Sequence, residues 1–258
     1  MHLLTCRLCL ALIVLLPRAT FAAALSAQDL ESIGRRVWQN ECNGRRDGLT
    51  SWNAGENFAS LGIGHFIWYP RGVDGPFEES FPKLVQFLAK NRVPLPAWLR
   101  AENDCPWSSR EEFQRDFHSG KMDALRDMLA ETVPLQSRFL ADRMEAALPK
   151  MLAEAPAARR AIVRENFEKL SATGDGTFAL IDYVNFKGEG TNPRERYKGE
   201  GWGLLQVLEN MKAEGRPVHA FAESAAETLA RRVRNSPPER NEARWLPGWK
   251  ARVHRYAE

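Results

Sequence analysis

The sequence predicts an α+β domain that is mainly helical, with a small β lobe directly after the first helix. Three observations indicate this class. Residues 26–40 place apolar side chains on one helical face, and residues 43–76 are rich in Gly, Asn and aromatic residues without a helical period. Beyond Pro76 the helical spacing returns almost throughout. Such an order predicts two lobes with a cleft between them, where ligands usually bind.

Residues 1–24 have the layout of a secretory signal peptide. Arg7 precedes an apolar stretch over residues 8–16, and small residues then suit cleavage after Ala22 or Ala24. The apolar stretch is too short to span a bilayer, which takes about 20 residues. We therefore expect a periplasmic or secreted protein without an integral membrane segment after cleavage.

The remaining residues, 25–258, suffice for one large domain with a substantial core. The chain has a formal net charge of +3, of which Arg7 and Arg18 lie in the predicted signal, so the domain is close to neutral. Net charge therefore gives no argument for a nucleic-acid partner.

Two cysteines, Cys42 and Cys105, remain after the predicted cleavage. In an oxidising compartment an isolated pair favours a disulfide. A loop of this length would stabilise the fold by about 4 kcal/mol in the chain-entropy model. The alternative is two buried free thiols.

The first helix is predicted over residues 26–40. Ser26 is its N-cap, and Asp29 three residues later completes a capping box. Its apolar face consists of Leu30, Ile33, Val37 and Trp38.

Beyond Pro76, apolar residues recur at spacings of three and four, and Pro or Gly residues separate the segments. Ser108 and Glu111 predict a further capping box. The predicted helical segments are 82–92, 109–117, 121–131, 135–154, 157–170, 176–186, 201–213, 218–234 and 239–256.

Glu41 is the most informative carboxylate. It follows Val37 by four residues, on the apolar face and at the C-terminal end of the first helix. Burial and the negative end of the helix dipole both favour its protonated form. A protonated carboxyl beside a cleft is what glycoside hydrolysis requires of its general acid. The alternative is a solvated carboxylate at a frayed helix end.

The segment Ser60-Leu-Gly-Ile-Gly-His65 has a simple interpretation as a β-turn in which glycine supplies a positive φ. It is no dinucleotide fingerprint, because the third glycine and a βαβ unit are missing. Together with Glu41, and with Leu49 and Trp52 between them, it resembles the phage-type lysozymes of glycoside hydrolase family 24. That family has Glu-Gly at the end of its first helix, then Leu-x-x-Tyr-x-Asp, then Thr-Ile-Gly-Ile-Gly-His.

Residues 178–211 and 229–256 are similar to later helices of the same family, in the same order. The resemblance implies a lysozyme-like domain over 25–258, with a β lobe at about 43–76 and a helical lobe at about 77–258. It also implies that the partner is peptidoglycan, cut between N-acetylmuramic acid and N-acetylglucosamine, with Glu41 as general acid and no cofactor.

The chain departs from the family at the second carboxylate. Aligned backwards from Ser60, which replaces the family threonine, the catalytic Asp falls on Ala54. Three alternatives remain: Glu56 as the base, Asp47 as the base, or no second carboxylate, as in goose-type lysozymes and lytic transglycosylases. Glu56 is favoured because Asn53 and Ser60 flank it with groups that position water.

The candidate catalytic residues are thus Glu41, Glu56 and Ser60, and the candidate substrate-binding residues are Trp52, Asn53, His65 and Trp68. His65 is expected to pair with an acid of the helical lobe. Trp68 is either a sugar-stacking residue or part of the core, and the core is favoured.

The histidines and cysteines show no metal-ligand spacing, so no metal site is expected. A Gly-x-Ser-x-Gly nucleophile elbow is absent from the sequence.

Arginines gather near the C-terminus with Trp245 and Trp249. They form either a solvated helical face or a patch that attracts anionic peptidoglycan stems. Nucleic acid is disfavoured, because Glu239 and Glu242 interrupt the run. The arginines are Arg231, Arg232, Arg234, Arg240, Arg244, Arg252 and Arg255.

The leading function is a peptidoglycan glycan-strand hydrolase of the muramidase type. A lytic transglycosylase on the same substrate is the near alternative. A lysozyme-like wall-binding protein without activity is the third, because Ala54 replaces the family Asp. The sequence specifies no immunity or inhibitor protein as a partner.

Overall fold

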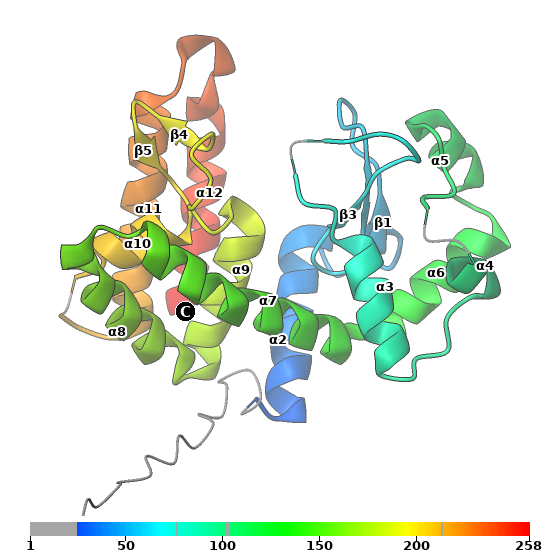
Figure 1. The fold of residues 1–258 in the computed structure, drawn as a ribbon, viewed down its shortest axis with the longest axis horizontal. Coiled ribbons are helices and arrows are strands. Elements are labelled where there is room, and N and C mark those ends of the chain that lie inside the picture. The colour runs from blue at the N-terminus through cyan, green and yellow to red at the C-terminus, as the bar shows by residue number, and fades with distance from the viewer. Residues whose placement is uncertain (1–24, 76, 102–103, 213) are drawn as a thin grey trace, which may run out of the picture.

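A computed structural model describes residues 25–75, 77–101, 104–212 and 214–258 (Figure 1). The predicted signal peptide, residues 1–24, lies outside the described residues. No helix in the described part of the chain is long and apolar enough to cross a membrane.

The described residues are mainly helical with a small antiparallel sheet, so the predicted α+β class is confirmed. The strands are β1 (Thr50–Ser51), β2 (Ala59–Leu61) and β3 (Phe66–Trp68), paired in the order β1-β2-β3, and a separate hairpin of β4 (Arg196–Tyr197) and β5 (Glu200–Gly201). The α-helices are α2 (Ala27–Cys42), α3 (Phe81–Lys90), α4 (Ala97–Ala101), α5 (Arg110–Asp116), α6 (Gly120–Glu131), α7 (Val133–Glu154), α8 (Arg160–Ser171), α9 (Gly174–Lys187), α10 (Leu204–Asn210), α11 (Pro217–Asn235) and α12 (Leu246–His254).

The molecule has two lobes joined by the long helix α7, with α2 packed against α7 and α9 (Figure 1). One lobe holds the three-stranded sheet and α3–α6. The other holds α8–α12 and the β4–β5 hairpin. Because α3–α6 belong to the same lobe as the sheet, this lobe extends well beyond the expected residues 43–76.

The predicted helical segments correspond to helices, with local differences. The start of the segment 201–213 is instead the end of the β4–β5 hairpin, and α10 is short. The last segment begins with two 3₁₀ turns before α12, and the short α4 was not predicted. Each difference involves an element of seven residues or fewer, for which periodicity is a weak signal.

The predicted N-terminus of α2 is confirmed. The Asp29 amide donates to Ser26 Oγ at 3.1 Å, and the Ser26 amide donates to Asp29 Oδ2 at 3.0 Å. The helix ends at Asn43, whose φ of 52° is left-handed, so Glu41 lies in its last turn.

The second predicted capping box is displaced by one residue. Ser109, not Ser108, caps α5 by accepting from the Glu112 amide. Ser108 instead donates its amide and hydroxyl to the Glu112 carboxylate. Two adjacent serines and two adjacent glutamates (Glu111 and Glu112) offer both registers, and the sequence did not distinguish them.

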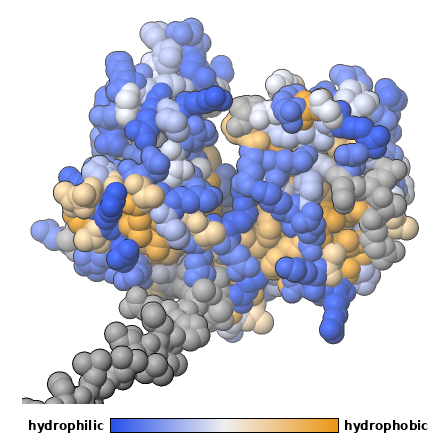
Figure 2. Space-filling view, in the orientation of Figure 1, coloured by the Kyte–Doolittle hydropathy of each residue, from blue (hydrophilic) through white to orange (hydrophobic). Residues whose placement is uncertain are grey.

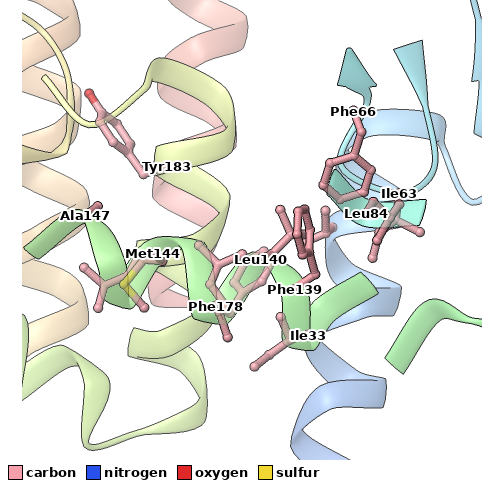
Figure 3. Close-up of a cluster of buried hydrophobic side chains, with 14 of the residues drawn as sticks. Ile33, Ile63, Phe66, Leu84, Phe139, Leu140, Met144, Ala147, Phe178 and Tyr183 are labelled. Atoms are coloured by element: carbon pink, nitrogen blue, oxygen red, sulfur yellow. The ribbon is translucent and has the colours of Figure 1, made fainter. Parts of the chain in front are cut away.

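The core runs through both lobes along α7 (Figure 3). Side chains of α7 contact the sheet lobe through Phe139, which packs on Phe66 with ring centroids 5.5 Å apart. Further along the helix, Met144 and Ala147 are buried toward the other lobe (Figure 3). One helix therefore fixes both walls of the space between the lobes.

Gln136 of α7 fastens the β2–β3 turn to this helix. Its Oε1 accepts from the Ile63 amide at 3.0 Å, and its Nε2 donates to the Leu129 carbonyl at 2.6 Å. Gly62 in the turn has a φ of 74°, and a Cβ there would lie 2.5 Å from Gln136 Oε1. The turn is therefore held at a fixed position against α7, and His65 is part of it.

Replacing Gln136 by Ala should destabilise the protein, because the buried Ile63 amide loses its partner and the Leu129 carbonyl keeps only the longer contact with Thr132 Oγ1, at 3.4 Å. Each unsatisfied group costs about 1–3 kcal/mol. Urea unfolding followed by circular dichroism measures the loss. Gln114→Ala, on the exposed face of α5, is the matched control and should leave the midpoint nearly unchanged. Equal midpoints for the two variants would contradict the assigned role of Gln136.

Candidate functional site

Glu41 lies in a cavity of about 520 Å³ between the two lobes. The β2–β3 turn and the loop before α3 form one wall, α7 contributes Leu140, Arg143 and Lys150, and α9 with the loop after it forms the other wall. The hollow between the lobes is visible in Figure 2. The cavity is therefore made by segments that are distant in the sequence.

Three side chains converge on the Glu41 carboxylate. Arg252 Nη2 donates to Oε1 at 2.5 Å, Asn185 Nδ2 donates to the same oxygen at 3.2 Å, and His65 Nδ1 lies 3.7 Å from Oε2. They come from α12, α9 and the β2–β3 turn. The Glu41 side chain is 15% exposed, so it is fixed in position while remaining open to the cavity.

Arg252 is shared between Glu41 and a second carboxylate, Asp182 of α9, which is fully buried. Its Nε donates to Asp182 Oδ2 at 2.9 Å and its Nη2 to Oδ1 at 2.7 Å. The Tyr256 hydroxyl also donates to Oδ2, at 2.5 Å. Burial by itself lowers the pKa of Arg252, but Asp182 and Glu41 raise it above the ordinary value. The guanidinium is therefore a permanent positive charge.

The charges of this cluster decide what Glu41 can do. With Glu41 and Asp182 both ionised, the two carboxylates and Arg252 carry one net negative charge, and a proton on Glu41 makes the cluster neutral. Because Asp182 neutralises Arg252, the guanidinium orients Glu41 without adding an excess of positive charge around the Glu41 carboxylate. The sequence predicted the partial burial of Glu41, but not its guanidinium partner.

His65 links Glu41 to Cys42. Its φ of 48° is left-handed, and its Nε2 lies 3.5 Å from Cys42 Sγ. A thiol, an imidazole and a carboxylate in this order resemble the catalytic residues of a cysteine hydrolase. However, Cys42 is buried, and burial raises its pKa to about 12, whereas a nucleophile must be an accessible thiolate. His65 therefore positions Glu41. An acid partner was expected, but this acid lies at the end of the first helix and not in the predicted helical lobe.

The predicted second carboxylates do not line the cavity. Glu56 accepts from Asn53 Nδ2 at 3.1 Å, and its carbonyl accepts from Trp52 Nε1, so the loop between β1 and β2 is closed on itself. Asp47 pairs with Arg45. Neither is brought to Glu41.

Three further predicted site residues are also away from the cavity. Ser60 and Trp68 are buried in β2 and β3, and Trp52 is buried directly after β1. Trp52 packs on Phe113 at 5.8 Å and Trp68 on Phe81 at 4.8 Å. Helices of the sheet lobe cover both tryptophans. Trp52 is therefore not a substrate-binding residue in this structure, and Trp68 has the core position that was favoured over sugar stacking.

Other carboxylates do line the cavity: Glu78, Glu189 and Glu195. Glu78 pairs with Lys83 and Arg143, and Glu189 pairs with Lys150 at 3.1 Å. Sequence reasoning missed all three. The available signals were that Glu189 lies between two glycines and that Glu78 lies just after the predicted β lobe, and Glu195 had no such signal.

Glu195 differs from the other two cavity carboxylates. Burial raises its pKa, and a hydrogen bond with Asn192 only partly opposes this shift.

No group of three or more His, Cys, Asp or Glu side chains within the described residues is arranged to hold a metal ion.

The predicted disulfide is not formed in the structure, in which Cys42 and Cys105 are both free and buried. Cys42 ends α2 beside His65 and against Gly48. Cys105 lies where its backbone bridges to Pro70. Each thiol fills its own place in the core, which is the alternative of two buried free thiols that the sequence left open.

No family model, curated protein or solved structure matches this chain. The interpretation of the site therefore depends on its geometry and chemistry.

Both thiols should resist alkylation in the folded protein, because burial raises the pKa of Cys42 and of Cys105 to about 12. A chain expressed from Leu25 onward contains only these two cysteines. Titration with Ellman's reagent at pH 8 should detect almost no thiol before unfolding and two thiols per chain in guanidinium chloride without reductant. If no free thiol is detected after unfolding, Cys42 and Cys105 form the disulfide that the sequence predicted.

Proposed function

We propose that this protein cleaves the glycan strand of peptidoglycan and that Glu41 is the proton donor. The observation that carries the proposal is the Glu41 carboxyl itself. It is oriented by Arg252, Asn185 and His65 and opens into a cavity between two lobes. Glycoside cleavage requires a positioned carboxyl group that can donate a proton, next to a groove that holds the polymer.

The order of elements supports a divergent lysozyme-like fold. A first helix ends with the acidic residue, and a small antiparallel sheet with a Gly-x-Gly-His turn and then a helical bulk follow. This is the order that the resemblance to the phage-type lysozymes implies. The peptidoglycan substrate, and the cut between N-acetylmuramic acid and N-acetylglucosamine, come from the same resemblance.

In the proposed reaction, protonated Glu41 gives its proton to the glycosidic oxygen as the bond to the anomeric carbon breaks. The positive charge that develops on the sugar ring is then next to a cluster with one net negative charge, formed by Glu41, Arg252 and Asp182. Arg252 and His65 are positioning residues in this scheme.

Two second steps are compatible with this site. In hydrolysis a water molecule attacks the anomeric carbon, and Glu195 is then the candidate to accept its proton, since it lines the cavity and Glu56 does not. In transglycosylation the muramic acid C6 hydroxyl attacks and returns its proton to Glu41, which forms a 1,6-anhydro end. Glu56 and Asp47 lie outside the cavity, so neither can act as the base there. This favours transglycosylation, which needs no second carboxylate.

We also propose that the protein acts outside the cytosol, in the periplasm or the medium. The support is the signal-peptide pattern of residues 1–24, and the substrate lies in the same compartment.

Replacing Glu41 by Gln should abolish the release of soluble fragments from purified sacculi, because the amide has no proton to give. The expected loss is about 10²- to 10⁴-fold. Glu31→Gln, on the same helix and paired with Arg35 at the surface, is the matched control. Glu56→Gln should also keep activity.

The result for Glu41→Gln separates the alternatives. Full activity of this variant would refute the proposal. A parent protein that binds sacculi but releases nothing would instead indicate a wall-binding protein without catalysis.

The mass of the fragments should identify the second step. Hydrolysis adds one water molecule to each cleaved linkage, and transglycosylation adds none. Mass spectrometry of the soluble products, without chemical reduction, distinguishes them. If the products carry the added water, Glu195→Gln should lower the rate; an unchanged rate would exclude Glu195 as the base.

A further inference from the structure

A second cavity of about 440 Å³ adjoins the Glu41 cavity. The two cavities share Phe77, Val184, Asn185, Gly188 and Glu195. They are therefore two parts of one groove. The second part lies against the β4–β5 hairpin and the C-terminal helices rather than against the sheet.

The two parts of the groove differ in charge. The Glu41 cavity is lined by four carboxylates, Glu41, Glu78, Glu189 and Glu195, and by two cations, Arg143 and Lys150, so that carboxylates are in excess there. Four cationic side chains line the second cavity, with Glu195 as its only carboxylate: Lys187, Arg194, Arg232 and Arg240. The groove is thus acidic at the proposed catalytic end and basic at the other end.

Glu242 holds two of these cations in place. It is fully buried behind them and accepts from Arg232 Nε at 2.8 Å and Nη2 at 3.0 Å, and from Arg240 Nε at 3.1 Å. The Tyr197 hydroxyl donates to it at 2.9 Å. Because one carboxylate serves two guanidinium groups, this cluster keeps one uncompensated positive charge at the cavity wall.

The other two cations have no carboxylate partner among the described residues. The Lys187 ammonium lies over the rings of Phe186, at 3.8 Å, and Trp249, at 3.7 Å. Burial lowers its pKa to about 7, and Arg232 adds to this effect. Arg194 is exposed at the rim, and no described residue forms an ion pair with it. An anion in this cavity would relieve repulsion among the cations, which Glu195 offsets only in part because burial raises its pKa.

Phe77 lies at the junction of the two cavities, with 51% of its surface exposed. An exposed phenyl ring beside polar groups is a suitable surface for the C–H face of a sugar. A saccharide that crosses Phe77 would have one residue near Glu41 and its neighbour near the arginines.

We propose that the second cavity is a subsite for a carboxylate group carried by the glycan substrate. Guanidinium groups bind carboxylates through paired hydrogen bonds, which fixes orientation as well as position. The subsite would thereby set which linkage lies at Glu41. This inference rests on the proposed function, and it adds the chemical group that the protein recognises.

Peptidoglycan offers this carboxylate from two sources. One is the peptide stem, and the other is the lactyl group of muramic acid after the stem is removed. A polymer of N-acetylglucosamine has neither. These three glycans, matched in length, distinguish a carboxylate subsite from general sugar binding.

The test measures binding by titration calorimetry in a Glu41→Gln background, so that the ligands are not cut. Arg194→Glu and Arg240→Glu should each weaken binding of carboxylate-bearing strands by about tenfold or more, as expected when an attractive charge becomes repulsive. Binding of the N-acetylglucosamine polymer should stay within about twofold. The matched control is Arg244→Glu, which reverses an exposed arginine beside Trp245 outside both cavities.

The outcomes separate this inference from the proposed function. A loss confined to stem-bearing strands assigns the subsite to the stem, and a loss with stem-free strands assigns it to the lactyl carboxylate. Unchanged binding of all three glycans by both variants, or an equal loss for the neutral polymer, would overturn the subsite while the function stands. A Glu41→Gln parent that binds none of the three would overturn both.

Discussion

The structure depends on one shared guanidinium. Arg252 binds the buried Asp182 and the cavity-facing Glu41 at once, and it thereby ties α12 to α9 and to the end of α2. Without Arg252, Asp182 would be a buried charge held only by neutral donors such as Tyr256 and Asn40, a costly arrangement. The same contact that stabilises the helical lobe also orients the carboxyl on which the proposed chemistry depends.

Helix α7 gives the groove its two walls. Gln136 near its start fixes the β2–β3 turn and hence His65, whereas Lys150 near its end pairs with Glu189 of the opposite wall. A single rigid helix thus sets the separation between the two walls of the Glu41 cavity. This explains why side chains from the turn, α9 and α12 converge on Glu41 although they are far apart in sequence.

The sequence predicted what depends on local pattern. The capped first helix, the position of Glu41 in its last turn, the small sheet and the helical bulk all follow from spacing and turn chemistry. The predictions from the sequence were wrong where long-range packing determines the position of a side chain. Trp52 is in the core because α5 covers the sheet, and Glu56 belongs to a closed loop. Arg252 was read as one of several terminal arginines, since nothing local to it indicates Asp182 or Glu41.

The separation of Arg252 and Glu41 by 211 positions has a consequence for biosynthesis. Contacts between such distant residues form only after a large loop has closed, and they are absent from any nascent chain that has not reached α12. The carboxyl therefore acquires its contact with Arg252 only after α12 has been made. For a protein that we propose attacks a cell wall, a nascent chain that has not reached α12 would be inert.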